Sequence, residues 1–350
     1  MTSRGLSWLM APYHVAALAT GAKSFRDNPV IGSPALNRAG LHVARVRIAH
    51  RMAEWRRARL AGLISAADRA AFHRDGFVMK RNFLSPAAFA ALQDEAFGFA
   101  GPGRQQTQGD AITRRLALDR IALAHLPATR ALLADPQWLG LVRYIGSFAL
   151  DPVVYIQTIF SRTRDGATDP QTHLHADAFH PSVKAWLFLT DVSADQGPFM
   201  YVPGSHRLTR RRLAWEREVS LSARSDPDYQ TSRGSPRVTP AALRRLGLPE
   251  PKVFAVPANT LVVADTVGFH ARGASARPSI RVEIWAYGRR NPFLPWLGLN
   301  VASLPVLKGN AVPAYWAAMD FAETFGLARN PWRYIGIVTP RTPLDSATAP

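Results

Sequence analysis

The spacing of hydrophobic residues divides this chain into a helical first part and a β-rich second part. In the first part, apolar residues recur at intervals of three and four, which predicts helices with one buried face. One helix begins at Ser65, a residue type that caps helix N-termini, and ends at Gly76. Ser85 and Pro86 open a further helix after a predicted strand at 76–84. Two more helices are predicted near 129–134 and 136–148.

After residue 151 the pattern changes to short runs rich in β-branched and aromatic residues, separated by turn residues. The predicted strands are 153–161, 185–192, 199–205, 252–258, 260–266 and 280–288. Helices followed by many short strands are typical of helices packed against a β-sandwich or jelly roll. We therefore expect a mainly β fold with flanking helices.

The same pattern predicts three regions along the chain. We expect a basic N-terminal extension (1–64), a main domain (65–300) whose first part is helical, and a C-terminal extension (301–350). Within the main domain, the arginine-rich stretch 207–250 has few strand signals. It is long enough to be an insertion that overlies a site.

The N-terminal extension is strongly basic, with ten basic and two acidic residues among its first 60. Its segment 41–60 predicts a helix whose apolar side contains Val46 and Trp55. Such a helix can lie on an anionic membrane, or it can pack on the main domain with its charges exposed. The pattern favours neither interpretation over the other.

The composition limits the chemistry that the chain can perform. Cysteine is absent, which excludes disulfides, thiolate metal sites, iron–sulfur clusters and a cysteine nucleophile. Histidine and the acidic residues are then the strong candidate ligands for a transition metal. The net charge of +18 favours anionic partners, although a solvated basic surface with no dedicated partner explains it as well.

The sequence gives little sign of a membrane span or of export. The apolar stretch 5–22 contains Pro12 and several polar residues, so it is too polar to cross a bilayer and weak as a signal peptide. The absence of disulfides suits the cytoplasm. We expect a cytoplasmic protein, and peripheral contact with the inner face of the membrane through the basic extension stays open.

One short segment concentrates metal-binding residue types: residues 171–180 read QTHLHADAFH. Residues two apart on a strand share a face, so His175 and Asp177 could chelate one ion. His270 follows a predicted strand by a short turn and can supply a third ligand. Two histidines and one carboxylate form the facial triad of non-haem iron(II) oxygenases, which leaves positions for a 2-oxo acid and dioxygen.

A dicarboxylic co-substrate also needs a buried cation for its distal carboxylate, because an unpaired charge is costly to bury. Arg281 begins an apolar strand eleven residues after His270, and its planar guanidinium suits a carboxylate. The alternative role of Arg281 is an ion pair with Glu283 on the same strand face. His173 and His180 are interpreted as residues that line the pocket or lie behind the metal ligands, although His173 could replace His175 as a ligand.

Four segments together resemble the phytanoyl-CoA dioxygenase family: HLHADAF, KAWLFLTDV, GPFMYVPGSHR and FHARGASARPSIRVEIWAY, within residues 71–288. The resemblance implies a double-stranded β-helix (cupin-like jelly roll), with Fe(II), 2-oxoglutarate and dioxygen as cofactor and co-substrates. It implies metal ligands at His175, Asp177 and His270, and a 2-oxoglutarate arginine at Arg281. It also implies co-substrate contacts at Trp186 and, more loosely, Gln157. The chain departs from the family at Arg272, where relatives often have a small or hydroxyl residue, so Arg272 is a second candidate anion contact.

The resemblance implies a dioxygenase that hydroxylates an aliphatic carbon of a small molecule and releases succinate and CO2. The basic extension and the 207–250 insertion favour a lipid-like or anionic substrate. Two other classes stay open: a metal-dependent β-sandwich enzyme that does not use 2-oxoglutarate, and a non-catalytic anion- or membrane-binding protein on the same fold. No nucleic-acid partner is expected, because the arginines lack the aromatic interleaving of a single-strand binding groove. The oligomeric state cannot be predicted.

Overall fold

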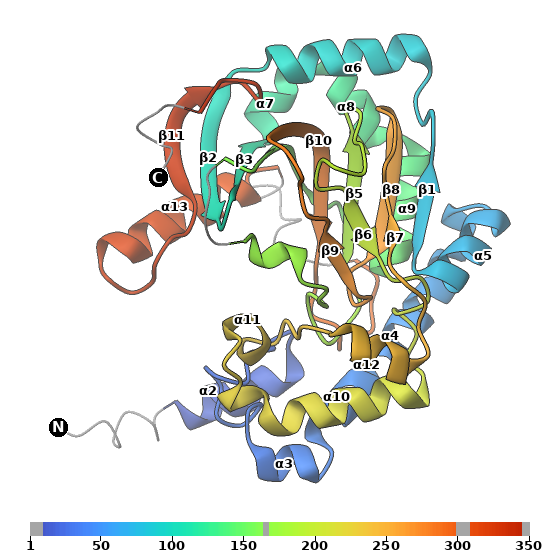
Figure 1. The fold of residues 1–350 in the computed structure, drawn as a ribbon, viewed down its shortest axis with the longest axis vertical. Helices are drawn as coiled ribbons and strands as arrows, with labels where there is room; N and C mark the ends of the chain where they lie inside the picture. The colour runs from blue at the N-terminus through green and yellow to red at the C-terminus, as the bar shows by residue number, and fades with distance from the viewer. Residues whose placement is uncertain (1–9, 164–167, 299–308, 345–350) are drawn as a thin grey trace.

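The computed structural model describes residues 10–163, 168–298 and 309–344, which form two antiparallel sheets with helices on the outside (Figure 1). The large sheet has the strand order β1-β8-β5-β10-β4-β3-β2-β11, and the small sheet has the order β7-β6-β9. Two sheets facing each other in this way confirm the predicted jelly-roll fold with flanking helices.

The strands of the large sheet are β1 (Phe77–Lys80), β2 (Gly101–Gln108), β3 (Ala111–Ala117), β4 (Val153–Ser161), β5 (Val183–Phe188), β8 (Thr260–Asp265), β10 (Ser279–Gly288) and β11 (Arg333–Val338). Those of the small sheet are β6 (Phe199–Tyr201), β7 (Lys252–Val253) and β9 (His270–Arg272). The N-terminal helices are α2 (Ala11–Ala16), α3 (Pro34–Arg38), α4 (Leu41–Leu60), α5 (Ala66–Asp75), α6 (Pro86–Gly98), α7 (Arg120–Ala124), α8 (Pro127–Ala134) and α9 (Pro136–Gly146). Later in the chain come α10 (Arg210–Ser222), α11 (Tyr229–Ser232), α12 (Pro240–Leu246) and α13 (Ala311–Thr324).

Alternation along the central strands gives the large sheet two different faces. On β5 and β10, Leu187 and Ile284 belong to a core shared with α5, α6, α8 and α9. Their neighbours Trp186 and Trp285 belong to a second core between the two sheets. The inner face of β10 therefore carries every second residue from Arg281 onward, which positions these side chains in the space between the sheets.

Local sequence signals set the helix ends that the sequence predicted. The Ser65 side chain accepts a hydrogen bond from the Asp68 N–H at the start of α5, and Gly76 ends that helix with a φ of 88°. Ser85 caps α6 in the same way, with Pro86 at its first position. These caps satisfy backbone groups that have no partner inside the helix.

Four strands (β2, β3, β9 and β11) and the structure of the 207–250 stretch were not predicted. β2 and β3 form a hairpin of mostly polar residues, and β11 pairs with β2 from the far end of the chain. The 207–250 stretch is largely helical and contains α10, α11 and α12. Figure 1 shows these helices beside α2 and α3, at the end of the molecule away from α6. Of the predicted C-terminal extension, residues 301–308 and 345–350 lie outside the described residues.

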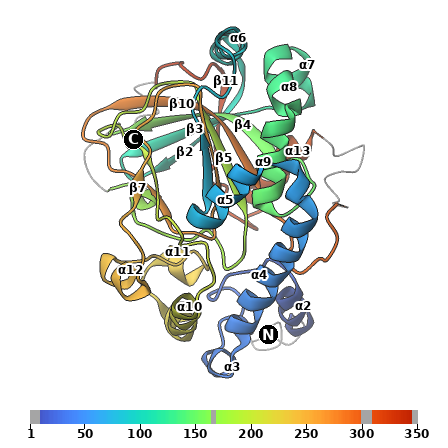
Figure 2. The ribbon, with the colours of Figure 1, turned by 90° about the vertical axis from the view of Figure 1, so that its right-hand side faces the viewer.

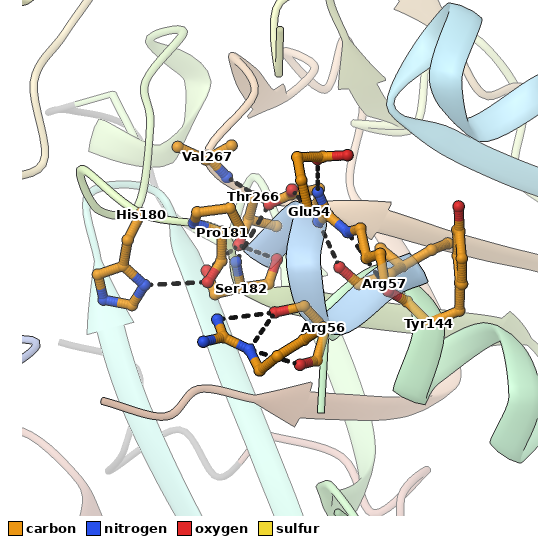
Figure 3. Close-up of polar contacts among 12 residues, drawn as sticks. Glu54, Arg56, Arg57, Tyr144, His180, Pro181, Ser182, Thr266 and Val267 are labelled. Carbon is orange, nitrogen blue, oxygen red and sulfur yellow. Dashed lines mark hydrogen bonds and ion pairs between the residues drawn. The ribbon is translucent and has the colours of Figure 1, made fainter. Parts of the chain in front are cut away.

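Helix α4 has the predicted bounds but not the predicted distribution of charge. It packs against α9 and α10 (Figure 2), and it buries Arg45, Arg56 and Arg57, while Ile48 and Trp55 are exposed. The guanidinium groups of Arg56 and Arg57 donate to backbone carbonyls of the main domain (Figure 3), and Arg57 also donates to the Asp265 carboxylate. Arg45 donates to backbone carbonyls of residues 18–22. An arginine with several such acceptors can be buried at little cost, which a hydrophobic pattern does not reveal.

Among the described residues, no helix is both long and apolar enough to cross a membrane.

Candidate metal centre

The three predicted ligands are brought together at the edge of the small sheet. His270 begins β9, and the backbones of His175 and His270 exchange two hydrogen bonds, with N···O distances of 3.0 and 2.9 Å. The Asp177 N–H donates to the Thr266 carbonyl, 2.9 Å away, in the loop before β9. Strand pairing thus places two distant segments of the chain side by side and fixes their register.

The potential ligand atoms lie within reach of one ion. The Asp177 Oδ1 atom is 3.7 Å from His175 Nε2 and 3.5 Å from His270 Nε2. All the ligand atoms of the three residues lie within 4.8 Å of one another. These separations suit three ligands on one side of a metal ion, with bonds of about 2.0–2.2 Å. The donor set of two imidazoles and one carboxylate is that of the facial triad.

Backbone carbonyl groups orient both imidazole rings. The Nδ1 atom of His175 lies 2.8 Å from the His173 carbonyl, and that of His270 lies 3.0 Å from the Gly268 carbonyl. These hydrogen bonds place the proton on Nδ1 and leave the Nε2 lone pair toward the centre. The Nε2 atom of His270 is buried and has no hydrogen-bond partner among the described residues. A metal ion would satisfy this atom, so the residues fit such an ion.

Charge at the centre also suits metal binding. Burial, together with the neighbouring His270, holds the pKa of His175 well below its usual value, so the ring stays neutral. Burial would raise the pKa of Asp177, but the positive charge of Lys184 and the contacts with His270 and His175 together outweigh it and hold that pKa well below its usual range. The Lys184 ammonium lies 2.6 Å from Asp177 Oδ2. His175 and Asp177 are therefore held in the proton-free form that binds a metal ion.

A cavity of about 370 Å³ opens beside the three ligands, and Arg281 lines it with them. One Nη atom of Arg281 donates to the Gly197 carbonyl at 2.6 Å, and Nε lies 3.0 Å from Glu283 Oε2. Arg281 can therefore serve both predicted roles. It forms the buried ion pair with Glu283, and its guanidinium still borders the cavity where the carboxylate of 2-oxoglutarate is expected. Its other Nη atom has no hydrogen-bond partner in the described part of the chain and can receive a carboxylate.

The other predicted co-substrate residues also line this cavity. Trp186 stacks on Phe199, with ring centroids 4.2 Å apart, and forms an apolar wall. The Gln157 amide donates to Glu283, and its oxygen accepts from Arg115. Arg272 forms an ion pair of 2.7 Å with the buried Asp169.

The two remaining histidines lie outside the residues that line the cavity. The side chain of His173 is exposed, and its contact with the centre is the backbone carbonyl that orients His175. His180 is fully buried, its Nδ1 lies 2.9 Å from the Pro181 carbonyl, and its Nε2 has no hydrogen-bond partner among the described residues. His175, and not His173, therefore belongs to the group of residues that could hold an ion.

Several cavity residues were missed in the sequence. Lys184 lies two positions before Trp186 on β5, and Arg289 continues the alternation of Arg281 on β10, so period-two spacing could have found both. No such pattern marks Lys23. Its ammonium donates to the Asp177 carbonyl at 2.5 Å, although the two residues are 154 positions apart in the sequence.

The comparison with protein families agrees with this geometry. Residues 72–239 match the model of the phytanoyl-CoA dioxygenase (PhyH) family. These residues belong to the phytanoyl-CoA dioxygenase family. The match includes His175 and Asp177 and ends before His270 and Arg281. All four residues line the same cavity in the structure. The family assignment and the cavity thus rest partly on different residues.

Two curated relatives are similar over part of the family region. The ectoine dioxygenases of Bordetella bronchiseptica and Bordetella parapertussis are each 29% identical over 170 residues. The alignment covers 43% of this chain and 52% of each relative. The chain thus spans about half the length of the curated relatives that it matches.

Solved structures with a similar fold are distant in sequence. The epimerase SnoN, in a complex with Fe3+, alpha ketoglutarate and nogalamycin RO, is 19% identical. The match covers 80% of this chain and 96% of that one, with a TM-score of 0.41. HygX from Streptomyces hygroscopicus, with nickel and 2-oxoglutarate bound, is 19% identical over 70% of this chain and 94% of that one, also with a TM-score of 0.41. Likenesses this weak carry no conclusion about activity.

Proposed function

We propose that this protein is an iron(II)- and 2-oxoglutarate-dependent oxygenase that hydroxylates an aliphatic carbon of an anionic small molecule. The observation that carries the proposal is one cavity lined by His175, Asp177, His270 and Arg281. The membership of residues 72–239 in the phytanoyl-CoA dioxygenase family supports it. When bound, iron(II) with 2-oxoglutarate and dioxygen supplies the oxidative chemistry, with release of succinate and CO2.

The protein's own residues position these groups. His175, Asp177 and His270 would hold the ion, and Lys184 keeps Asp177 Oδ2 occupied so that Oδ1 faces the two imidazoles. Arg281 would bind the distal carboxylate of 2-oxoglutarate through its free Nη atom. The stacked rings of Trp186 and Phe199 exclude water on one side, which strengthens these electrostatic contacts.

The charges around the cavity support an anionic substrate. Six cationic side chains line the cavity with one carboxylate, that of Asp177; the cations are Lys23, Arg115, Lys184, Arg272, Arg281 and Arg289. Glu283 and Asp169 neutralise two of the arginines from behind. With a divalent ion and the dianion of 2-oxoglutarate added, the cavity keeps an excess of positive charge. An excess of this kind favours a negatively charged ligand.

An anaerobic titration tests the proposed co-substrate site. Iron(II) and 2-oxoglutarate together are expected to give a visible charge-transfer band in the wild-type protein, and this band should disappear in His175→Ala and Arg281→Ala. His173→Ala is the matched control, because its side chain is exposed and outside the cavity lining, and it should retain the band. A wild-type protein without the band would refute the proposed function.

We also infer that any contact with an anionic membrane uses the outer face of α4. This face exposes Arg47 and Arg51 together with Ile48 and Trp55. Each basic residue near an anionic surface contributes about 1 kcal/mol to binding. Arg47→Glu/Arg51→Glu should therefore lose flotation with phosphatidylcholine vesicles that contain phosphatidylglycerol. Arg81→Glu/Arg130→Glu, which changes the same charge at other exposed positions, should not, and equal flotation of both variants would reject the contact.

A further inference from the structure

A segment of the N-terminal extension forms part of the wall of the metal cavity. Lys23 lines the cavity with the three metal ligands, and its ammonium donates to the Asp177 carbonyl. The segment before it, residues 18–22, approaches the same region through backbone contacts with the main domain. A region that the sequence assigned to packing or to a membrane surface thus reaches the candidate active site.

The main domain and α4 hold this segment in a defined position. The buried guanidinium of Arg45 donates to the carbonyls of Leu18, Thr20 and Ala22, at 3.1, 2.9 and 2.7 Å. From the other side, Arg289 donates to the Gly21 carbonyl at 2.5 Å. A Cβ atom at Gly21 would lie 3.2 Å from Nε2 of the buried His180, so the backbone is closely packed there. The position of Lys23 is therefore built into the fold.

Lys23 and Arg289 differ from most of the other cations of the cavity in their partners. Lys184, Arg272 and Arg281 each form an ion pair with a carboxylate. Lys23 and Arg289 form no ion pair with the described residues; Lys23 donates to a backbone carbonyl, and Arg289 to a backbone carbonyl and to the Tyr287 side chain. Both side chains have further donors. Asp177 attracts the Lys23 ammonium without forming an ion pair with it, and the two neighbouring cations can bind an anion together.

The two residues also mark a boundary between two cavities. Both line the metal cavity, and both line a second cavity of about 460 Å³ between α2, the 21–28 segment and α11. Along β10, the inner face reads Arg281, Glu283, Trp285 and Tyr287, and Arg289 follows just after the end of the strand. Arg281 and Arg289 are thus about 26 Å apart at their Cα atoms, at opposite ends of one strand face.

We propose that Lys23 and Arg289 form an anion subsite for the primary substrate, which takes a phosphate or carboxylate group. This inference rests on the proposed oxygenase function, in which 2-oxoglutarate occupies the Arg281 end of the strand face. The anionic group binds at the boundary of the two cavities, the carbon that reacts points toward the metal ligands, and any remaining part of the substrate extends into the second cavity. The N-terminal segment is then a determinant of substrate specificity.

Anion titrations of the full-length protein test the subsite. Inorganic phosphate and acetate are titrated separately into protein saturated with nickel(II) and 2-oxoglutarate, which occupies the metal and Arg281, and binding is measured by calorimetry. Lys23→Met and Arg289→Met should weaken binding of one of these anions about tenfold or more, since a hydrogen bond to a charged group contributes about 1.5–3 kcal/mol. The anion that responds identifies the phosphate or the carboxylate class.

Two controls separate the subsite from general effects. Arg289→Lys keeps the charge and should retain most of the anion affinity that Arg289→Met loses. If Arg289→Met lost affinity only because it folded poorly, restoring the charge would not restore the affinity. Arg47→Met removes an exposed cation elsewhere and should leave the affinity unchanged. Equal affinity of wild type, Lys23→Met and Arg289→Met for both anions would overturn the subsite. The wild-type charge-transfer band reports the co-substrate site independently, so failure of the oxygenase proposal would be seen separately.

Discussion

At the scale of single residues, the metal centre depends on backbone geometry as much as on its ligating side chains. Each histidine of the triad bonds through Nδ1 to the carbonyl group two residues before it, that of His173 or that of Gly268. These carbonyls fix the ring orientation and the tautomer, and contacts of this kind often change metal affinity 10- to 100-fold. A small displacement of either carbonyl group should therefore lower the metal affinity even when all three candidate ligands are unchanged.

Gly268 offers a direct test of this dependence. A Cβ atom at this position would lie 1.9 Å from Tyr201 Oη, which itself donates to the Asp265 carbonyl. Gly268→Ala should therefore shift the loop that carries the carbonyl partner of His270. We expect an unfolding free energy lower by about 1–3 kcal/mol, measured in urea, and weaker nickel(II) binding by calorimetry.

Gly98→Ala is the matched control, since a Cβ there would meet no atom within 4 Å. It should leave the metal affinity unchanged and the stability equal or slightly higher. If Gly268→Ala behaved in the same way, the close packing of the loop would not matter for the centre.

The grouping of His175, Asp177 and His270 could be predicted from the sequence because a few residue types at fixed spacing carry the signal. His175 and Asp177 share a strand face, and Arg281 follows His270 at a short offset. Lys23 could not be predicted, because hydrogen bonds from Arg45 of α4 to the carbonyls of Leu18 and Ala22 place it in the cavity. Hydrogen bonds from side chains to distant carbonyls leave no periodic pattern in a sequence.

At the scale of elements, alternation and capping signals predicted the central strands and five of the described helices, namely α4, α5, α6, α8 and α9. The hairpin of β2 and β3 was missed because many of its residues are polar. Gln105, for example, lies opposite Arg114 on the neighbouring strand, so the alternation of apolar and polar residues that marks a strand is weak. The inward arginines of α4 were missed for a related reason. A charged residue is predicted to be exposed unless its buried acceptors are known.

The junction between α4 and α10 depends on such a buried charge. Glu216 of α10 accepts from Arg212 and lies 2.9 Å from His42 of α4. Burial would raise the pKa of Glu216, but the charge of Arg212 and the contact with His42 outweigh it and lower that pKa from 4.5 to about 2. A carboxyl group with a lowered folded pKa stabilises the fold above its unfolded pKa and loses this effect as the pH falls toward the folded value.

Glu216→Gln should therefore be less stable than wild type near pH 6, by up to about 3 kcal/mol, since each pKa unit corresponds to about 1.4 kcal/mol. The deficit should shrink as the pH falls from 5 toward 2, where the wild-type carboxylate takes up its proton. Urea unfolding of both proteins at a series of pH values measures it. A deficit that stays constant over this range would show that ionised Glu216 is not what joins the two helices.

At the scale of the whole molecule, α4 connects the N-terminal extension to the loop that carries His270. Arg57 of α4 lies 2.7 Å from Asp265 Oδ2, and both side chains are almost fully buried. Asp265 in turn accepts from the backbone N–H groups of Ser182 and Val267, and the latter lies three residues before the candidate ligand His270. The chain before residue 60 is therefore part of the support of the metal centre and not a separable tail.

Removal of Arg57 should reveal this connection. Arg57→Met leaves the Asp265 carboxylate buried without its cation, and breaking a buried pair in this way costs about 3–5 kcal/mol. The double variant Arg57→Met/Asp265→Asn removes the stranded charge and should recover part of the loss, whereas Arg47→Met, at an exposed position of the same helix, should change stability by less than about 0.5 kcal/mol. Urea unfolding gives the three free energies, and nickel(II) calorimetry gives the effect on the centre. If Arg57→Met unfolds like Arg47→Met, then α4 packs on the domain without supporting the loop, and the metal ligands are held by the two sheets alone.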